Sequence, residues 1–188
     1  MATRLKQLDP ATLYIENPVA EVNRVQGLQK KLASKVDWLE KAFGIAYREQ
    51  KKVDSGDFAP QIYLGGKEYL EVYPDDSVSG MCFFDVEDEI ALSQEDKRNF
   101  TARINIVFFV NLEKAFPTLE HRADAEARQA VINVLLKYGH GWQIQEIVKG
   151  VDNVYSRYNW VKPHAKIDKQ PFHVFSLECE VIYDCYKY

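Results

Sequence analysis

The segment Arg103–Leu112 constrains the fold of this chain more than any other. Its even-numbered positions are uniformly apolar, and its odd-numbered positions still include Val107 and Phe109. Successive side chains of a strand point to opposite faces of a sheet, so this pattern predicts a strand that is buried on both faces. Such a strand lies in the interior of a sheet that other elements cover on each side.

Four other segments have patterns that are typical of strands. Gln61–Tyr73 reads as a hairpin, because Gly65-Gly66 can adopt the positive φ values that a two-residue turn needs. A short strand is expected over Gly80–Val86, and a weaker one, broken near Gly150, over Gln143–Tyr155. In Phe172–Tyr186 one face alternates cleanly through His173, Phe175, Leu177, Cys179, Val181, Tyr183 and Cys185.

Two segments have helical spacing. From about Pro18 to Phe43, apolar residues recur every three or four positions, with Asn17 as N-cap and Gly44 at the C-terminal end. The resulting helix would be about 40 Å long. A second helix is expected from Pro117-Thr118 to about Tyr138, ended by Gly139. We therefore expect one α+β domain over 1–188, with a mixed or mainly antiparallel sheet packed against the long N-terminal helix and a central helix.

Composition excludes several classes of function. The 188 residues carry a formal charge of −4, so specific nucleic-acid binding is not expected. The N-terminus lacks the apolar core of a signal peptide, and no apolar run approaches the roughly 20 residues that cross a bilayer. We expect no membrane association, and we expect the protein to be made and to fold in a reducing cytoplasm. Cys82, Cys179 and Cys185 have no metal-type spacing and read as small buried strand residues.

No catalytic signature emerges from the sequence. The four histidines have no metal-ligand spacing, and His173 reads as a hydrogen-bonded residue at the edge of the core. Gly65-Gly66-Lys67 lacks the spacing of a phosphate-binding loop. Glu178 and Glu180 share one strand face, which would fit a carboxylate pair for acid–base chemistry but fits a polar or inter-subunit face better. We expect no enzymatic activity, cofactor or metal.

Charged loops are the most unusual surfaces. The acidic segment Asp85–Asp96, with Glu87, Asp88 and Glu89, is expected to be a loop, as is the mostly basic segment Ser156–Pro171. The candidate interface residues of the basic loop are Arg157, Tyr158, Trp160 and Lys162. Opposite charges on two loops suit a head-to-tail contact between copies, which closes into a ring when the rotation allows. Ordinary solvated loops are the alternative.

The strand 103–112, the helix end Ala130–Leu136 and the closing strand Pro171–Tyr183 resemble tail-terminator and neck proteins of long-tailed bacteriophages and prophages. The resemblance implies a non-enzymatic structural protein that forms a ring, often a hexamer, at the head–tail junction. Its partners would be its own copies and the virion proteins of the tail tube and connector. It would reside in the host cytoplasm during assembly and then in the virion.

Two other readings stay open from the residues themselves. One is a small-molecule enzyme or ligand-binding domain with a pocket beneath the loop 156–171. The other is a monomeric adaptor that binds one protein partner.

Overall fold

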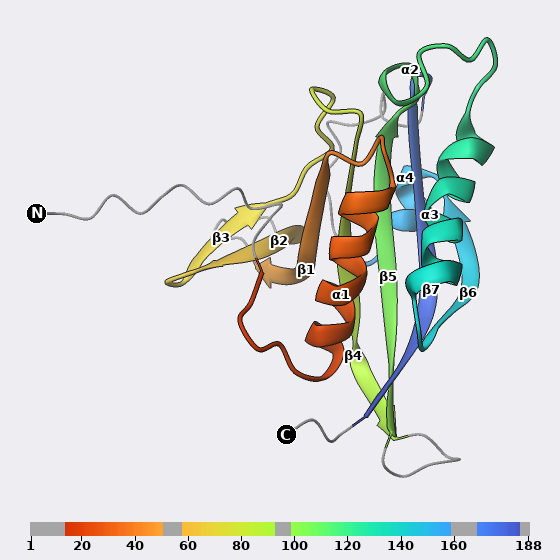
Figure 1. Ribbon diagram of the computed structural model, residues 1–188. Coiled ribbons are helices and arrows are strands. Elements are labelled where there is room, and N and C mark those ends of the chain that lie inside the picture. Colours follow the sequence, from red (N-terminus) through yellow and green to blue (C-terminus); the bar gives the residue numbers. More distant parts are fainter. Residues whose placement is uncertain (1–13, 51–57, 93–98, 159–168, 185–188) are drawn as a thin grey trace, which may run out of the picture.

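A computed structural model describes residues 14–50, 58–92, 99–158 and 169–184 of the chain (Figure 1). In these residues the strands form one seven-stranded sheet in the order β3-β2-β1-β4-β5-β7-β6. The β1–β4 pair is parallel and the other neighbouring pairs are antiparallel. The fold is therefore α+β with a mixed, mainly antiparallel sheet, as the sequence predicts. The elements are α1 (Ala20–Lys35), β1 (Lys41–Gln50), β2 (Phe58–Gly65), β3 (Glu68–Glu71), β4 (Gly80–Leu92), β5 (Asn99–Asn111), α2 (Leu112–Ala115), α3 (Asp124–Tyr138), β6 (Trp142–Lys149), α4 (Val151–Val154) and β7 (Phe172–Asp184).

Strand β5 occupies the interior position that its two apolar faces predict. It pairs with β4 on one side and with β7 on the other. Phe108 is fully buried and stacks on Phe175 of β7, with 4.9 Å between ring centroids. On the opposite face, Val107 and Phe109 are also buried, in a second apolar cluster. The sheet therefore has a core on each side.

The two cores are covered by different elements. Helices α1 and α3 pack side by side on one face of the sheet, and α4 lies on the other (Figure 1). The helix-covered core contains Leu32 of α1 and Val131 of α3, together with the face of β7 that begins at His173. The smaller core beneath α4 contains Val154, Tyr155 and Tyr158. The hairpin of β2 and β3 forms as predicted, with positive φ at Gly65 and Gly66.

Both predicted helices are longer than the observed ones. Helix α1 has 16 residues, which makes it about 24 Å long instead of 40 Å. It begins after Val19 and ends at Val36, where the backbone becomes extended. The apolar residues Leu39 and Phe43 continue the helical spacing but belong to the turn and to β1. Helix α3 begins at Asp124 rather than near Pro117, and it ends before Gly139 as predicted.

The acidic segment that was expected to be a loop is largely a strand. Strand β4 continues through Leu92 and stays paired with β5, with a register shift between Val86 and Ile90. Strand β1 pairs with β4 only as far as Asp85. Beyond that residue no described strand pairs with the other edge of β4, and the strand projects past α1 (Figure 1). Residues 93–98 lie outside the described part of the chain.

We predict that Gly80→Ala destabilises the protein by about 1–3 kcal/mol. A Cβ at Gly80 would lie 2.7 Å from Cζ3 of Trp38 and 3.1 Å from its carbonyl oxygen. The Trp38 ring is buried and packs edge-on against Phe108, so it cannot move aside freely. Urea denaturation measures the loss.

The control is Gly27→Ala, which lies on the exposed side of α1 and brings no atom within 4 Å of the new Cβ. It should stabilise the protein by about 0.5–1 kcal/mol, because alanine favours a helix interior over glycine. Equal effects of the two substitutions would contradict the packing described for Trp38.

Candidate functional site

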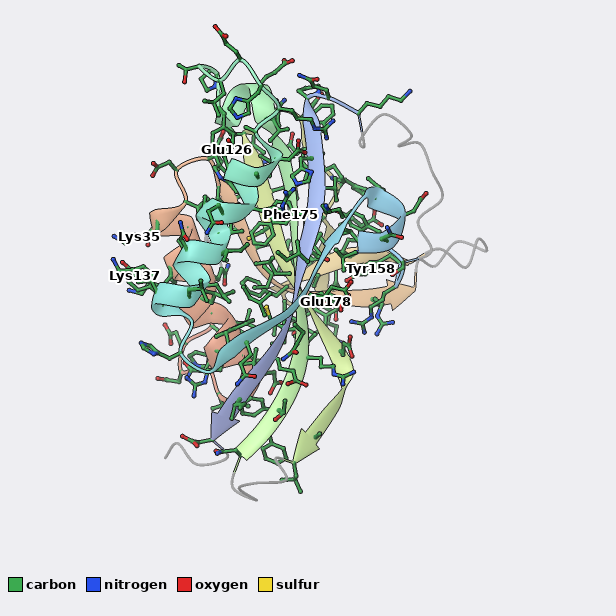
Figure 2. The ribbon with its side chains drawn as sticks, turned by 90° about the vertical axis from the view of Figure 1, so that its right-hand side faces the viewer. Lys35, Glu126, Lys137, Tyr158, Phe175 and Glu178 are labelled. Carbon is green, nitrogen blue, oxygen red and sulfur yellow. The ribbon has the colours of Figure 1, made fainter. Side chains whose placement is uncertain are left out.

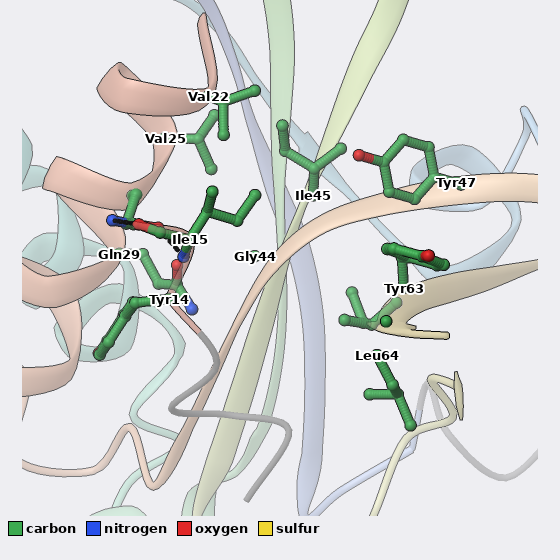
Figure 3. Close-up of a pocket in the computed structure, with 13 residues that line it drawn as sticks. Tyr14, Ile15, Val22, Val25, Gln29, Gly44, Ile45, Tyr47, Tyr63 and Leu64 are labelled. Atoms are coloured by element: carbon green, nitrogen blue, oxygen red, sulfur yellow. Dashed lines mark hydrogen bonds between the residues drawn. The ribbon is translucent and has the colours of Figure 1, made fainter. Parts of the chain in front are cut away.

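An apolar groove lies between α1 and the strands β1 and β2 (Figure 3). Its volume is about 420 Å³. Val22 and Val25 point into it from the helix, and Ile45 points into it from β1. Tyr47 and Tyr63 stand at its strand side and are 44% and 42% exposed. This is an exposed apolar surface with aromatic residues, the composition that marks interaction sites on proteins.

Two glutamine side chains hold the helix wall of the groove in place. The Gln26 amide binds the backbone of Ile15 at both ends: its Oε1 accepts from the Ile15 N–H at 2.6 Å, and its Nε2 donates to the Ile15 carbonyl at 3.0 Å. The Nε2 of buried Gln29 donates to the carbonyl of Ala42 at 2.7 Å, which ties α1 to β1. The groove is thus built on secondary structure with satisfied polar groups.

The structure places Arg157 and Tyr158 differently from the predicted exposed loop. Tyr158 is 4% exposed and packs in the smaller core, where its ring meets Phe83 edge-on, so its expected role as an exposed interface residue is wrong. Nη1 of Arg157 lies 3.1 Å from Oδ2 of Asp85. Arg157 therefore pairs with an acidic residue of its own chain. The candidates Trp160 and Lys162 lie outside the described residues.

Asp85 is the acidic partner in this internal pair. It is 3% exposed, on the face of β4 that α4 covers. Burial raises the pKa of Asp85 to about 6, although the guanidinium groups of Arg157 and Arg48 lower it. The Tyr158 hydroxyl lies near the same carboxylate, and burial raises its pKa strongly, with a further increase from the charge of Asp85. The pair joins the end of the α4 segment to the sheet.

The remaining acidic candidates lie on or near β4. Glu87 lines a shallow polar cleft of about 200 Å³ on the sheet face that carries α4. Asp88 and Glu89 belong to the irregular part of β4, between Val86 and Ile90. The same cleft contains Arg103, Asn105, Gln145, Glu178 and Glu180. The structure therefore brings Glu87 together with Glu178 and Glu180, the carboxylates that the sequence assigns to one strand face.

His173 is a buried structural residue, as its place on the core face of β7 predicts. Its Nε2 lies 2.9 Å from Nη1 of Arg128, and its Nδ1 lies 2.9 Å from Oδ1 of Asp124. Because arginine can only donate, Nε2 accepts and the ring proton sits on Nδ1, from which it is donated to Asp124. Burial lowers the pKa of His173 to about 4, which agrees with a neutral ring.

The described cysteines are also buried, with Cys82 and Cys179 inside the helix-covered core. Burial raises the pKa of both thiols, that of Cys179 to about 12, which disfavours the reactive thiolate. Cys185 lies outside the described residues. Within the described ranges, no three His, Cys, Asp or Glu side chains are placed to share a metal ion.

Comparison with known proteins finds no matching family model and no matching curated protein. Among the helices of the described ranges, none has the length and apolar character needed to span a bilayer.

The sequence alone could not locate the groove, because its lining comes from four separate segments. Strand alternation in the sequence does indicate that Tyr47 and Tyr63 point away from a core residue. Each follows a buried strand residue, Ala46 or Ile62, so each large aromatic side chain falls on the opposite side of its strand from the neighbouring core residue.

We predict that Asp85→Asn changes how stability depends on pH. The folded pKa of Asp85 lies above the value of an unfolded chain, so the folded protein holds this proton more tightly. The wild type should therefore gain stability relative to Asp85→Asn as the pH falls from about 7 to about 4. The gain is up to roughly 3 kcal/mol for a pKa difference of about two units. Urea denaturation of both proteins across this range measures it, and a constant difference would contradict the raised pKa.

Proposed function

We propose that this chain is a non-enzymatic structural protein of the tail-terminator or head–tail joining type, from a phage or prophage. It acts by assembling with copies of itself into a ring that contacts the tail tube and the connector. Two arguments support the proposal: the resemblance of the sequence to tail-terminator and neck proteins, and the α+β architecture of the chain. The observation that carries it is the apolar groove between α1, β1 and β2, with its exposed Tyr47 and Tyr63.

The groove favours a macromolecular contact in which a second copy is the occupant. The exposed Ile15 also lines it, and Tyr69 packs against its lining residue Tyr63 at 5.1 Å between ring centroids. Tyrosine is enriched in the energetically important centres of protein interfaces. A surface of this kind is stabilised when a partner removes it from water.

The open sheet offers a second, unlike surface for the same contact. The sheet ends at β3 on the groove side and at β6 on the other side, and β6 exposes Ile147. When a groove at one end meets a different surface at the other end of the next copy, the contact is heterologous, and such contacts close into rings or continue as filaments. A ring requires no catalytic residue, and its function is geometric.

A ligand-binding domain is the second candidate function, and the volume of the groove favours it. About 420 Å³ is within the range of small-molecule sites. The lining is apolar with the two glutamines, so the ligand would be an apolar molecule. This site lies between α1 and the β1–β2 strands, a different place from the pocket beneath the loop 156–171 that the sequence suggested.

We predict that Tyr47→Asp combined with Tyr63→Asp abolishes self-association. Two carboxylates at the groove mouth would have to lose water on contact, which is costly without a charged partner. Size-exclusion chromatography with light scattering over a concentration series measures the mass. The wild type should form a species of several subunits, and the variant should remain a monomer.

The control is Leu119→Asp, which places one carboxylate at an exposed apolar residue between α2 and α3. It should assemble like the wild type. A wild-type chain that stays monomeric at the highest concentrations would contradict the proposed ring, and stabilisation of that monomer by apolar small molecules would favour the ligand-binding alternative.

A further inference from the structure

We infer that the acidic half of the sheet face, which no described helix covers, docks on a lysine patch on the helices of a neighbouring copy. The lysine patch consists of Lys31 and Lys35 of α1 and Lys137 of α3. The acidic face consists of Glu87 of β4, Glu146 of β6, and Glu178 and Glu180 of β7. The inference rests on the proposed self-assembly, to which it adds the groups that meet and the direction in which copies stack.

The lysine patch carries positive charge that no described carboxylate neutralises. All three side chains are exposed, and none of them forms an ion pair with a described residue. Lys31 and Lys137 lie on different helices but meet at one ring, each with its Nζ 5.3 Å from the centroid of Tyr138. Lys31 and Lys35 are four residues apart on α1, a spacing at which like charges repel. The patch is therefore concentrated and unpaired.

The acidic face carries an excess of negative charge among its described residues. Glu146 and Glu178 are direct partners in the β6–β7 register, and like charges at directly opposed positions destabilise a sheet. On its other side, Glu178 is opposite Asn105 of β5, which carries no charge. Burial, followed by the charges of Glu146 and Glu87, raises the pKa of Glu178. The face therefore holds carboxylates that repel one another.

Among the described residues, one cation, Arg103, forms an ion pair on this face. Nε of Arg103 lies 3.9 Å from Oε1 of Glu180, and Gln145 donates to the other oxygen of that carboxylate at 3.3 Å. Glu87, Glu146 and Glu178 form no ion pair with a described residue. Four carboxylates thus face one guanidinium, and cationic groups from outside would relieve the repulsion.

The two surfaces lie on opposite sides of the sheet, which makes them complementary between copies. Figure 2 shows Lys35 and Lys137 on the helix layer, with Tyr158 on the far side of the sheet. The lysine patch of one copy can therefore meet the acidic face of the next, and the same contact can repeat. Charge complementarity of this kind guides association and fixes the register of the partners. It favours a second copy as the occupant over nucleic acid, which the acidic face would repel.

A charge-reversal pair of variants tests the inference. The acidic-face variant carries Glu146→Lys and Glu178→Lys, and the lysine-patch variant carries Lys31→Glu and Lys35→Glu. Each variant alone has two surfaces of like charge, so its self-association should weaken on the order of 100-fold. An equimolar mixture should assemble again, because the basic surface of one protein meets the acidic surface of the other. Light scattering after size exclusion measures the masses, and circular dichroism checks that each variant is folded.

The control variant carries Glu113→Lys and Glu120→Lys, which change the net charge as the acidic-face variant does but lie on and after α2. It should assemble normally. If the single variants assemble like the wild type, or if the mixture fails to recover, the inference is wrong while the ring proposal stands. A wild type that is monomeric at all concentrations overturns both. Binding of duplex DNA by the wild type that the lysine-patch variant loses would assign the lysines to nucleic acid and also overturn the inference.

Discussion

The burial of β5 on both faces is the constraint on which the rest of the structure depends. A strand with Phe108 on one face and Val107 and Phe109 on the other is stable only when both faces are shielded from water. The helices α1 and α3 pack on one face. Among the described residues, the other face carries the short α4 and the residues up to Tyr158, and a small second core forms there around Phe83 and Tyr158. Further along β4, β5 and β7, away from that core, the side chains on the same face are polar.

This division explains why Asp85 is buried. It stands at the border between the apolar and polar halves of the face that carries α4, on the same side of β4 as Phe83. Tyr158 covers it, and Arg157 supplies the charge that a buried carboxylate needs. Two of the seven predicted interface residues, Arg157 and Tyr158, therefore serve the fold. Of the carboxylates further along, Glu180 pairs with Arg103, whereas Glu87, Glu146 and Glu178 form no ion pair with a described residue.

The sequence predicted those elements whose local pattern agrees with their environment. β5 and β7 alternate without interruption, the Gly65-Gly66 turn has few other conformations, and Gly139 ends α3. The errors have physical causes. Leu39 and Phe43 preserve a spacing of three to four residues across the end of α1, but pairing of β1 with β4 favours strand over helix there. The acidic run in β4 looked like a loop because charge opposes burial, yet pairing with β5 requires only backbone groups.

The surfaces were harder to predict because both combine residues that are distant in the sequence. The groove needs α1, β1 and β2 together, and the lysine patch needs α1 and α3. Their arrangement also bears on symmetry. A two-fold contact through either charged surface would place lysines against lysines or carboxylates against carboxylates, and such repulsion disfavours it. A head-to-tail contact brings opposite charges together at every interface. The separation of charge across the sheet therefore selects the direction in which copies stack. The rotation between neighbours sets whether the repeat closes into a ring and how many copies the ring contains.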